Sequence, residues 1–427
     1  MTSVSIADRA PWLRDAALQA LLTALSEGGE EARIAGGAVR NALLGEEAGD
    51  IDIATTNLPD ETIARAERAG FKAVPTGYEH GTITVVAAGV PHEVTTLRAD
   101  VETDGRRAKV RYGRDWKQDA ERRDFTMNAL YATADGTVVD LVGGLADIET
   151  RTLRFIGDPE DRIREDYLRI LRFFRFFARY GAGRPDAAGL KACARLKEGL
   201  DGLSAERVWM ELKKLLSAAD PARALLWMRQ SGVLTRILPE SEKWGIDAVH
   251  GLVAAERDLG WTPDHLLRLA AIVPPDPVRV GALAMRLKTS NSERDRLVAW
   301  AAAPAVSPTM AEGDLAKLAY RSGREGIADR LTLSLAGARA RATTDDKALL
   351  EAGGYVRLRR FLADWTAPKF PLAGADLIAI GVPAGPKMGN LLRDLEEAWI
   401  DAGFAPDRAG LLENAESLKS RYLGGDS

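Results

Sequence analysis

Two carboxylates separated by one residue, Asp50 and Asp52 in the run GDIDIAT, are the residues of this chain best suited to chemistry. Ile51 and Ile53 alternate with them, so a strand here directs the isoleucines to the core and both carboxylates to the opposite face. Same-face neighbours on a strand lie roughly 6.5 to 7 Å apart. Carboxylates at that spacing can share Mg²⁺ ions with substrate phosphates, as nucleotidyl transfer requires. A solvated edge strand is the alternative for such a pair taken alone.

A Gly-Gly pair stands ahead of the aspartates and changes how they are interpreted. Gly36 and Gly37 close the short apolar strand ARIA and precede a helix expected from about Ala38 to Leu44. Free backbone N–H groups at a helix start can bind phosphate, and Arg40, one turn in, can add charge-assisted hydrogen bonds to the same anion. The pair therefore predicts a phosphate site beside the carboxylates, with a plain turn as the alternative.

Two further segments are expected to supply polar groups to the same site. Glu93 in HEVTTLR is the candidate third carboxylate for a metal cage, with a solvent-facing glutamate as the alternative. The run ERRDFTMNALYA, residues 121–132, is expected to begin as a helix with Asp124 and Asn128 on one face. Asp124 can accept a ribose 2′-hydroxyl while the adjacent Arg123 binds phosphate, which distinguishes NTP from dNTP. A surface ion-pair cluster is the alternative.

The run IREDYLRILRFFRFFARYG, residues 163–181, predicts one long amphipathic helix with an apolar stripe and a charged side. Asp166 and Arg169 can recognise a base edge, because a carboxylate accepts from an exocyclic amino group and a guanidinium donates to a ring acceptor. Such a pair selects C and A and leaves unpaired groups against U and G. A solvated arginine face is the alternative. The charged side comprises Glu165, Arg169, Arg172, Arg175 and Arg179, and the stripe comprises Ile170, Phe173, Phe174 and Phe177.

The composition of the 427 residues is globular, with 46% hydrophobic and 28% charged residues and a net charge of −4. No apolar run is long enough to span a bilayer and no signal peptide is visible, so no membrane partner is expected. One cysteine favours a reducing cytoplasm, and four scattered histidines make a zinc centre improbable. Because the net charge is negative, any RNA binding must come from local basic faces. No obligate protein partner is evident.

The first third of the chain alternates short strands with helices, and almost everything after Gly157 has a helical pattern. This order predicts an α+β fold with a small mixed sheet and helices packed on one face. Residues 98–118 lack periodicity and are expected to form a mobile loop. The expected strands are ARIA, DIDIA, KAVPT, GTITVVAAG, HEVTTLR and a hairpin in ALYATADGTVVDLVGG.

A second Gly/Pro cluster interrupts the C-terminal helices. Gly385 and Pro386 are expected to open a helix at about Lys387, whose amine and nearby N–H groups would bind a tRNA phosphate. A loop between two packing helices is the alternative.

The motifs GGAVRNALLG, GDIDIAT, ERRDFTMNA, REDYLRILR and SAERVWMEL resemble, in order and spacing, those of the class II tRNA nucleotidyltransferase and bacterial poly(A) polymerase family. The resemblance is strong over residues 30–215, and residues 374–399 look like the family's tRNA-facing segment. It implies a polymerase β-type nucleotidyltransferase head followed by an all-α neck, body and tail. The head, neck, body and tail are implied to span residues 1–150, 151–218, 219–305 and 306–427, respectively.

The resemblance also implies template-independent addition of CMP, CMP and AMP to the 3′ end of tRNA, with CTP and ATP as substrates and two Mg²⁺ ions as cofactor. The implied metal ligands are Asp50 and Asp52, with Glu93 as a further catalytic carboxylate. The implied RNA-binding residues are Arg175, Arg179 and Lys387. The implied nucleotide-binding residues are Gly36, Gly37, Arg40, Arg123, Asp124, Asn128, Glu165, Asp166, Arg169 and Arg172.

One position departs from the family pattern. Asn41 stands where the family usually has Asp after Arg40, which keeps the hydrogen bonding and removes the charge, so activity is expected to survive. His250 and His265 are not followed by Asp, so the hydrolase activity of some relatives should be absent.

Three alternatives remain open at the level of the sequence. A poly(A) polymerase shares every head motif, although the non-basic C-terminal run ENAESLKSRYLGGDS favours CCA addition. Specialists that add only CC or only A also carry these motifs. A non-catalytic tRNA-binding protein is disfavoured, because such a protein has no use for a metal site.

Overall fold

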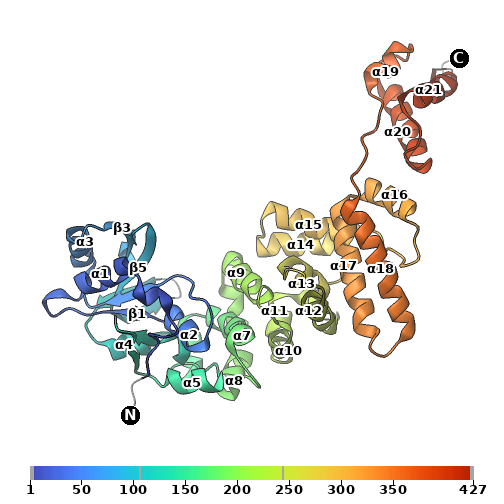
Figure 1. The fold of residues 1–427 in the computed structure, drawn as a ribbon. Helices are drawn as coiled ribbons and strands as arrows, with labels where there is room; N and C mark the ends of the chain where they lie inside the picture. Colours follow the sequence, from blue (N-terminus) through green and yellow to red (C-terminus); the bar gives the residue numbers. More distant parts are fainter. Residues whose placement is uncertain (1–3, 105–106, 243–244, 424–427) are drawn as a thin grey trace. The chain divides into compact units, whose positions relative to one another are not determined.

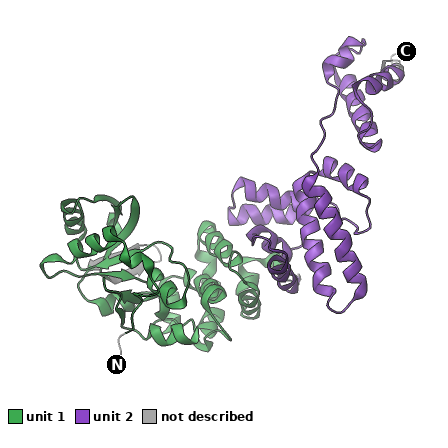
Figure 2. Ribbon diagram, in the orientation of Figure 1, with its two compact units in different colours: residues 1–242 green, residues 243–427 purple. Residues whose placement is uncertain are grey.

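The chain forms two compact units, residues 1–242 and 243–427, in the computed structural model (Figure 2). The structure describes residues 4–104, 107–242 and 245–423. The first unit combines a sheet with helices, and the second is helical (Figure 1). The predicted boundaries after residues 150, 218 and 305 do not coincide with this division and stay predictions.

A mixed seven-stranded sheet forms the centre of the first unit, in the order β3-β4-β5-β2-β1-β8-β9. β2 and β5 run parallel and the other neighbours run antiparallel. The α+β prediction and its strands are confirmed, although the strand expected from Asp50 begins two residues later. The strands are β1 (Ala32–Ala35), β2 (Asp52–Thr55), β3 (Lys72–Gly77), β4 (Thr82–Ala87), β5 (Val90–Thr96), β8 (Leu130–Ala132) and β9 (Val138–Asp140).

Helices cover both faces of this sheet, so the predicted single helical face is wrong. α1 (Ala16–Leu25) and α3 (Pro59–Arg68) pack against β1, β3 and β4. α4 (Trp116–Glu121) packs on the opposite face, where its Trp116 and Ala120 share a core cluster with Tyr131 of β8. The remaining helices of the unit are α2 (Gly37–Leu44), α5 (Gly144–Thr150), α6 (Pro159–Glu165), α7 (Leu168–Tyr180), α8 (Ala187–Arg195), α9 (Ala205–Leu216), α10 (Ala222–Gln230) and α11 (Val233–Ile237).

The segment 98–118 is not the irregular loop that its charges suggest. β6 (Arg98–Asp104) and β7 (Arg107–Tyr112) pair antiparallel as a separate two-stranded sheet, and α4 follows them. The prediction failed because the alternation that identifies a half-buried strand is weak in this charged segment.

The helix predicted over 163–181 is interrupted at Asp166. Asp166 has extended backbone between α6 and α7, and its Oδ1 accepts a hydrogen bond from the backbone N of Leu168 at 3.1 Å. No proline or glycine marks this break, so the sequence pattern runs through it. The apolar stripe is confirmed, since Ile170, Phe173, Phe174 and Phe177 are all buried.

The second unit is built from helices. Prolines at 274–277 and 304–308 lie at two of the breaks between them, whereas the breaks at 288–290 and 342–345 contain neither proline nor glycine. α19, α20 and α21 share a core of their own that includes Leu377, Leu391, Trp399 and Leu411. In the described residues no helix is both long enough and apolar enough to cross a membrane. The helices are α12 (Asp247–Leu259), α13 (His265–Ile272), α14 (Pro277–Leu287), α15 (Asn291–Ala302), α16 (Glu312–Ser322), α17 (Arg324–Arg341), α18 (Asp346–Asp364), α19 (Gly374–Ala379), α20 (Pro386–Asp401) and α21 (Arg408–Leu423).

Candidate active site

A pocket of about 520 Å³ in the first unit collects most of the predicted nucleotide-binding residues. Its walls come from the β1–α2 turn, the start of β2, the segment after α4, and α7 with its flanking residues. Six arginines and three aspartates line it, so the pocket is basic in a chain whose net charge is negative. The lining residues are Ala35, Gly36, Gly37, Arg40, Asp52, Arg122, Arg123, Asp124, Asn128, Asp166, Leu168, Arg169, Arg172, Phe176 and Arg207.

The β1–α2 turn requires glycine at its first position. Gly36 has φ 61°, and a Cβ there would lie 3.1 Å from both the Asn128 carbonyl oxygen and Nη1 of Arg123. Its own N–H is not free for phosphate, because it donates to the Leu130 carbonyl at 2.8 Å. Any phosphate contact by the backbone must therefore come from the N–H groups of the first turn of α2, which starts at Gly37.

Arg40 is buried beside this turn and its hydrogen-bond partners are neutral. Its guanidinium donates to Asn41 Oδ1 at 2.8 and 3.1 Å, to the Tyr180 hydroxyl at 2.7 Å, and to Asn128 Oδ1. In the described part of the chain it forms no ion pair, and burial lowers its pKa. A buried cation whose hydrogen-bond partners are neutral, at the edge of a pocket, is suited to binding an anion.

Asn41 keeps the hydrogen bonding expected of it without the charge of an aspartate. Its Oδ1 accepts from Arg40, and its Nδ2 donates to the Glu47 carbonyl at 2.8 Å. Glu47 lies in the loop that leads to Asp50. The Asn41 side chain therefore links α2, on the phosphate side of the pocket, to the loop that carries Asp50.

The two predicted metal ligands lie at the start of β2, and only Asp52 lines the pocket. Asp52 begins the strand and Asp50 lies in the bend before it, so strand geometry does not place both on one face. The β2–β5 register pairs Ile53 with Val94, which brings Asp52 next to Glu93 on the sheet face opposite Ile53 and Val94.

Like charges gather around Asp52 and raise its pKa. Burial, then Glu93 and Asp50, raise this pKa to about 6, while Arg123 opposes the shift. No three His, Cys, Asp or Glu side chains of the described residues form a metal-binding group in this structure, and the three-carboxylate cage with Glu93 stays a prediction. The catalytic role of Glu93 stays a prediction.

Asp52→Asn is expected to stabilise the metal-free protein by an amount that grows with pH. The raised pKa of Asp52 means that the folded state binds this proton more tightly than the unfolded chain, whose Asp pKa is about 3.9. Wild-type stability is therefore lost as pH rises from about 4 through about 6, and asparagine avoids that loss. Thermal unfolding in chelator at about pH 4.5 and about pH 8 checks this. Equal Tm differences at both pH values would contradict it.

Asp124 and Asn128 meet through a bend instead of along one helix face. α4 ends at Glu121 and only a 3-10 turn covers 126–128, so the predicted helical i, i+4 arrangement is wrong. Asn128 Nδ2 still donates to Asp124 Oδ1 at 3.1 Å, and Arg172 donates to Asp124 Oδ2 at 2.5 and 2.8 Å. Although burial alone would raise the pKa of Asp124, Arg172 and Asn128 hold it below its usual value.

Asp119 is a buried carboxylate that sequence reasoning missed. It accepts hydrogen bonds from Arg122 at 2.6 Å, from Arg123 at 3.2 Å and from the Tyr131 hydroxyl at 2.6 Å. It thereby fixes two of the arginines that line the pocket. Its spacing of three and four residues from these arginines on a short helix was the available signal.

The predicted base-recognition residues are held by partners outside the expected pair. Asp166 is bound by Arg207 of α9 at 2.6 Å, and Arg169 is bound by Glu165 at 2.5 Å. Glu165 contacts Arg169 without lining the pocket. Arg207 lines the pocket without being among the predicted site residues, because its contact with Asp166, 41 residues away, leaves no local sequence signal.

The predicted RNA-binding residues lie outside the pocket. Arg175 is half-buried and bound by Glu211 at 2.5 Å, whereas Arg179 is exposed, 3.7 Å from Glu46. Both line a separate cleft of about 800 Å³ together with Lys213 and Lys214. Lys387 lies in the first turn of α20 in the second unit, where the predicted helix start is confirmed.

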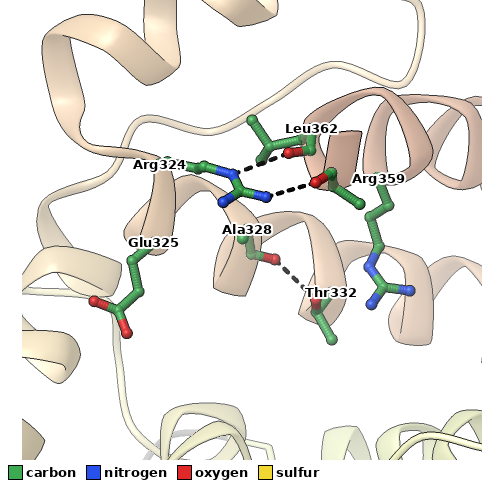
Figure 3. Close-up of a pocket in the computed structure, with 7 residues that line it drawn as sticks. Arg324, Glu325, Ala328, Thr332, Arg359 and Leu362 are labelled. Atoms are coloured by element: carbon green, nitrogen blue, oxygen red, sulfur yellow. Dashed lines mark hydrogen bonds between the residues drawn. The ribbon is translucent and has the colours of Figure 1, made fainter. Parts of the chain in front are cut away.

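A cavity of about 510 Å³ in the second unit, lined by α17 and α18, contains no predicted site residue (Figure 3). Arg324 donates to the backbone carbonyls of Leu362 and Ala363 at 3.0 and 2.7 Å, so its guanidinium is used within the fold. Glu325 is the one carboxylate among the lining residues. The cavity therefore lacks the clustered charges that distinguish the pocket of the first unit.

Two protein-family models match segments of this chain. The family of poly(A) polymerase head domains matches residues 32–154, and that of the probable RNA- and SrmB-binding site of polymerase A matches residues 186–244. The mitochondrial CCA tRNA nucleotidyltransferase 1 of Mus musculus is 34% identical over 404 residues, which cover 92% of this chain and 88% of that protein. The CCA-adding enzyme of Levilactobacillus brevis is 31% identical over 401 residues, 92% of this chain and 95% of its own.

A solved structure agrees with these matches. The crystal structure of the Bacillus stearothermophilus CCA-adding enzyme in complex with CTP aligns with a TM-score of 0.73 and 27% identity. The alignment covers 95% of this chain and 98% of that one.

Proposed function

This chain belongs to the family of CCA-adding tRNA nucleotidyltransferases, and on that premise we propose that it adds CMP, CMP and AMP to the 3′ end of tRNA without a nucleic-acid template. CTP and ATP are its substrates. The observation that carries the proposal is the pocket in which the buried Arg40, the carboxylate of Asp52 and the polar residues of α7 meet.

The phosphate end of the pocket binds the triphosphate. The first turn of α2 supplies N–H groups, and Arg40 and Arg123 supply positive charge. The 3′-hydroxyl of tRNA attacks the α-phosphorus, a new P–O bond forms, and the bond to the β-phosphate oxygen breaks as pyrophosphate leaves. Arginines directed at the phosphates stabilise the charge that develops on this leaving group.

Asp50 and Asp52 hold the metal ions of the reaction. Enzymes of this family use divalent metals, and we assign two Mg²⁺ ions here. The fit is supported by Asp52, which is surrounded by Asp50 and Glu93 and forms no side-chain hydrogen bond or ion pair within the described ranges. When bound, such ions lower the pKa of the attacking hydroxyl and neutralise phosphate charge. The remaining ligands would come from the substrate phosphates and water.

The opposite end of the pocket recognises the ribose and the base. Asp124, kept ionised by Arg172, accepts the ribose 2′-hydroxyl, and Asn128 supports it. Asp166 accepts from the amino group of C or A, and Arg169 donates to the adjacent ring acceptor. Glu165 and Arg207 orient these two side chains.

RNA is bound by local basic surfaces, since the net charge is negative. The cleft beside α7 offers Arg179 and Lys214, and the start of α20 offers Lys387. We assign the head, neck, body and tail to residues 1–150, 151–218, 219–305 and 306–427, respectively. The single buried cysteine supports a cytoplasmic location.

The product ladder of the purified protein tests this function. tRNA lacking its 3′ end is incubated with Mg²⁺ and CTP, ATP or both. We expect two additions with CTP alone and a third when ATP is also present. A long adenylate ladder would indicate a poly(A) polymerase, a ladder that stops after two additions or needs pre-existing CC would indicate a specialist, and no extension would indicate a binding protein.

Removal of residues 374–427 is expected to raise the KM for tRNA severalfold and to flatten its salt dependence. The segment carries Lys387 at a helix start, and loss of a phosphate contact reduces the number of counterions released on binding. The KM values for CTP and ATP should stay near wild type, because the pocket lies in the other unit.

The truncation has to be shown to fold, because Tyr320 and Arg321 of α16 contact Glu396 and Glu397 of α20. Lys387→Ala provides a milder variant, with Lys347→Ala as a matched exposed-lysine control. If the folded truncation bound tRNA as tightly as the full chain at every salt concentration, residues 374–427 would not contribute to tRNA recognition.

A further inference from the structure

Tyr180 is a buried residue of α7 that contacts the phosphate side of the pocket. Its hydroxyl accepts a hydrogen bond from Arg40 Nη2 at 2.7 Å and donates to Asn41 Oδ1 at 3.3 Å. The Arg40 guanidinium also stacks on the Tyr180 ring, 4.0 Å from its centroid. Figure 1 shows α2, which carries Arg40, beside α7.

The Tyr180 hydroxyl holds the Arg40 guanidinium together with the side chains of Asn41 and Asn128. Within the described residues the guanidinium has neutral hydrogen-bond partners, Asn41, Asn128 and Tyr180, and Tyr180 is the one of these three that comes from α7. A planar guanidinium binds phosphate best when its donors point in one fixed direction. The stacked ring and the hydroxyl add to the hydrogen bonds that Asn41 and Asn128 accept, and help to fix the plane of the guanidinium and its rotation within that plane.

The same helix carries the residues assigned to base and ribose recognition. Arg169 and Arg172 precede Tyr180 on α7 and line the pocket, and Phe176 stacks against both Tyr180 and Arg40. A shift of α7 would therefore move the base-recognition residues and the support of Arg40 together. The rings bind Arg40 without neutralising it, so its full charge stays available for a polyphosphate.

We infer that Tyr180 is a positioning residue for nucleotide binding, which acts through Arg40 and couples triphosphate binding to the helix that recognises the base. This inference rests on the proposed function and extends it to a residue outside the pocket lining. Tyr180→Phe removes only the hydroxyl and keeps the stacked ring.

The test is a double-mutant cycle of Tyr180→Phe with Arg40→Lys, a variant that keeps the charge but cannot reproduce the guanidinium contacts. For Tyr180→Phe we expect the KM for CTP and ATP to rise by a common factor of about 3 to 10. We expect kcat and the KM for tRNA to change by less than about twofold, and inhibition by CMP, which lacks the β- and γ-phosphates, to be unaffected. On the Arg40→Lys background the same change should add less than about twofold.

Tyr355→Phe is the matched control, because the Tyr355 hydroxyl donates to a backbone carbonyl in the second unit. Thermal unfolding identifies any general loss of stability. Wild-type KM values in Tyr180→Phe, additive effects in the cycle, or equal weakening of CTP and CMP would each overturn the inference. If wild type itself neither binds nor incorporates CTP and ATP, the proposed function fails instead, which separates the two results.

Discussion

Asp52→Asn and Asp50→Ala are each expected to lower CMP and AMP incorporation about a thousandfold or more in Mg²⁺, while tRNA affinity stays within a few-fold. The expectation follows from the position of Asp52 at the edge of a pocket otherwise lined mainly by arginines. A carboxylate there, with Asp50 and Glu93 nearby and no cation partner in the described residues, can attract divalent cations that the rest of the pocket repels.

Single-turnover incorporation with saturating tRNA and nucleotide measures the chemical step directly. Glu47→Gln is the matched control, because Glu47 is an exposed carboxylate of the same loop and its backbone carbonyl, not its side chain, contacts Asn41. The control should retain near-normal turnover. Near-normal turnover in either aspartate variant would show that the metal assignment is wrong. A large loss of tRNA affinity would instead show that these carboxylates support RNA binding.

Asp166→Ala and Arg169→Ala are expected to reduce selection for C and A over U and G by about 10- to 100-fold. The complementary donors and acceptors of these side chains are the physical basis of selection, so their loss removes the penalty on U and G. The ratio of kcat/KM values for the four nucleotides measures this effect. Asp161→Ala and Arg164→Ala are controls, because this exposed ion pair lies on the neighbouring helix α6.

Arg207 provides an independent check of the same assignment. It binds Asp166 at 2.6 Å, so Arg207→Ala should reproduce part of the loss of selectivity seen in Asp166→Ala. Combining the two substitutions should add little to Asp166→Ala alone. Unchanged discrimination among the four nucleotides in all of these variants would contradict base recognition by α7.

The sequence by itself determined the local elements and the order of the site motifs. Alternation predicted the strands, a period of 3.6 predicted the buried phenylalanine stripe of α7, and Gly36 predicted the turn before α2. These features were predictable because strand alternation and helix amphipathicity depend on residues within a few positions of one another. Proline likewise lies at some helix ends of the second unit, as at 274–277 and 304–308.

The tertiary structure decided which side chains pair and therefore what each one is free to do. Asp166 pairs with Arg207 instead of Arg169, Asp124 pairs with Arg172, and Gly36 uses its own N–H on Leu130. The partners in these two ion pairs are 41 and 48 residues apart. Periodicity carries no information about such contacts, because their geometry is set by how separate helices and strands pack. The neutral hydrogen-bond environment of Arg40 follows from the same cause, since the fold brings Tyr180 and Asn128 to it from distant segments.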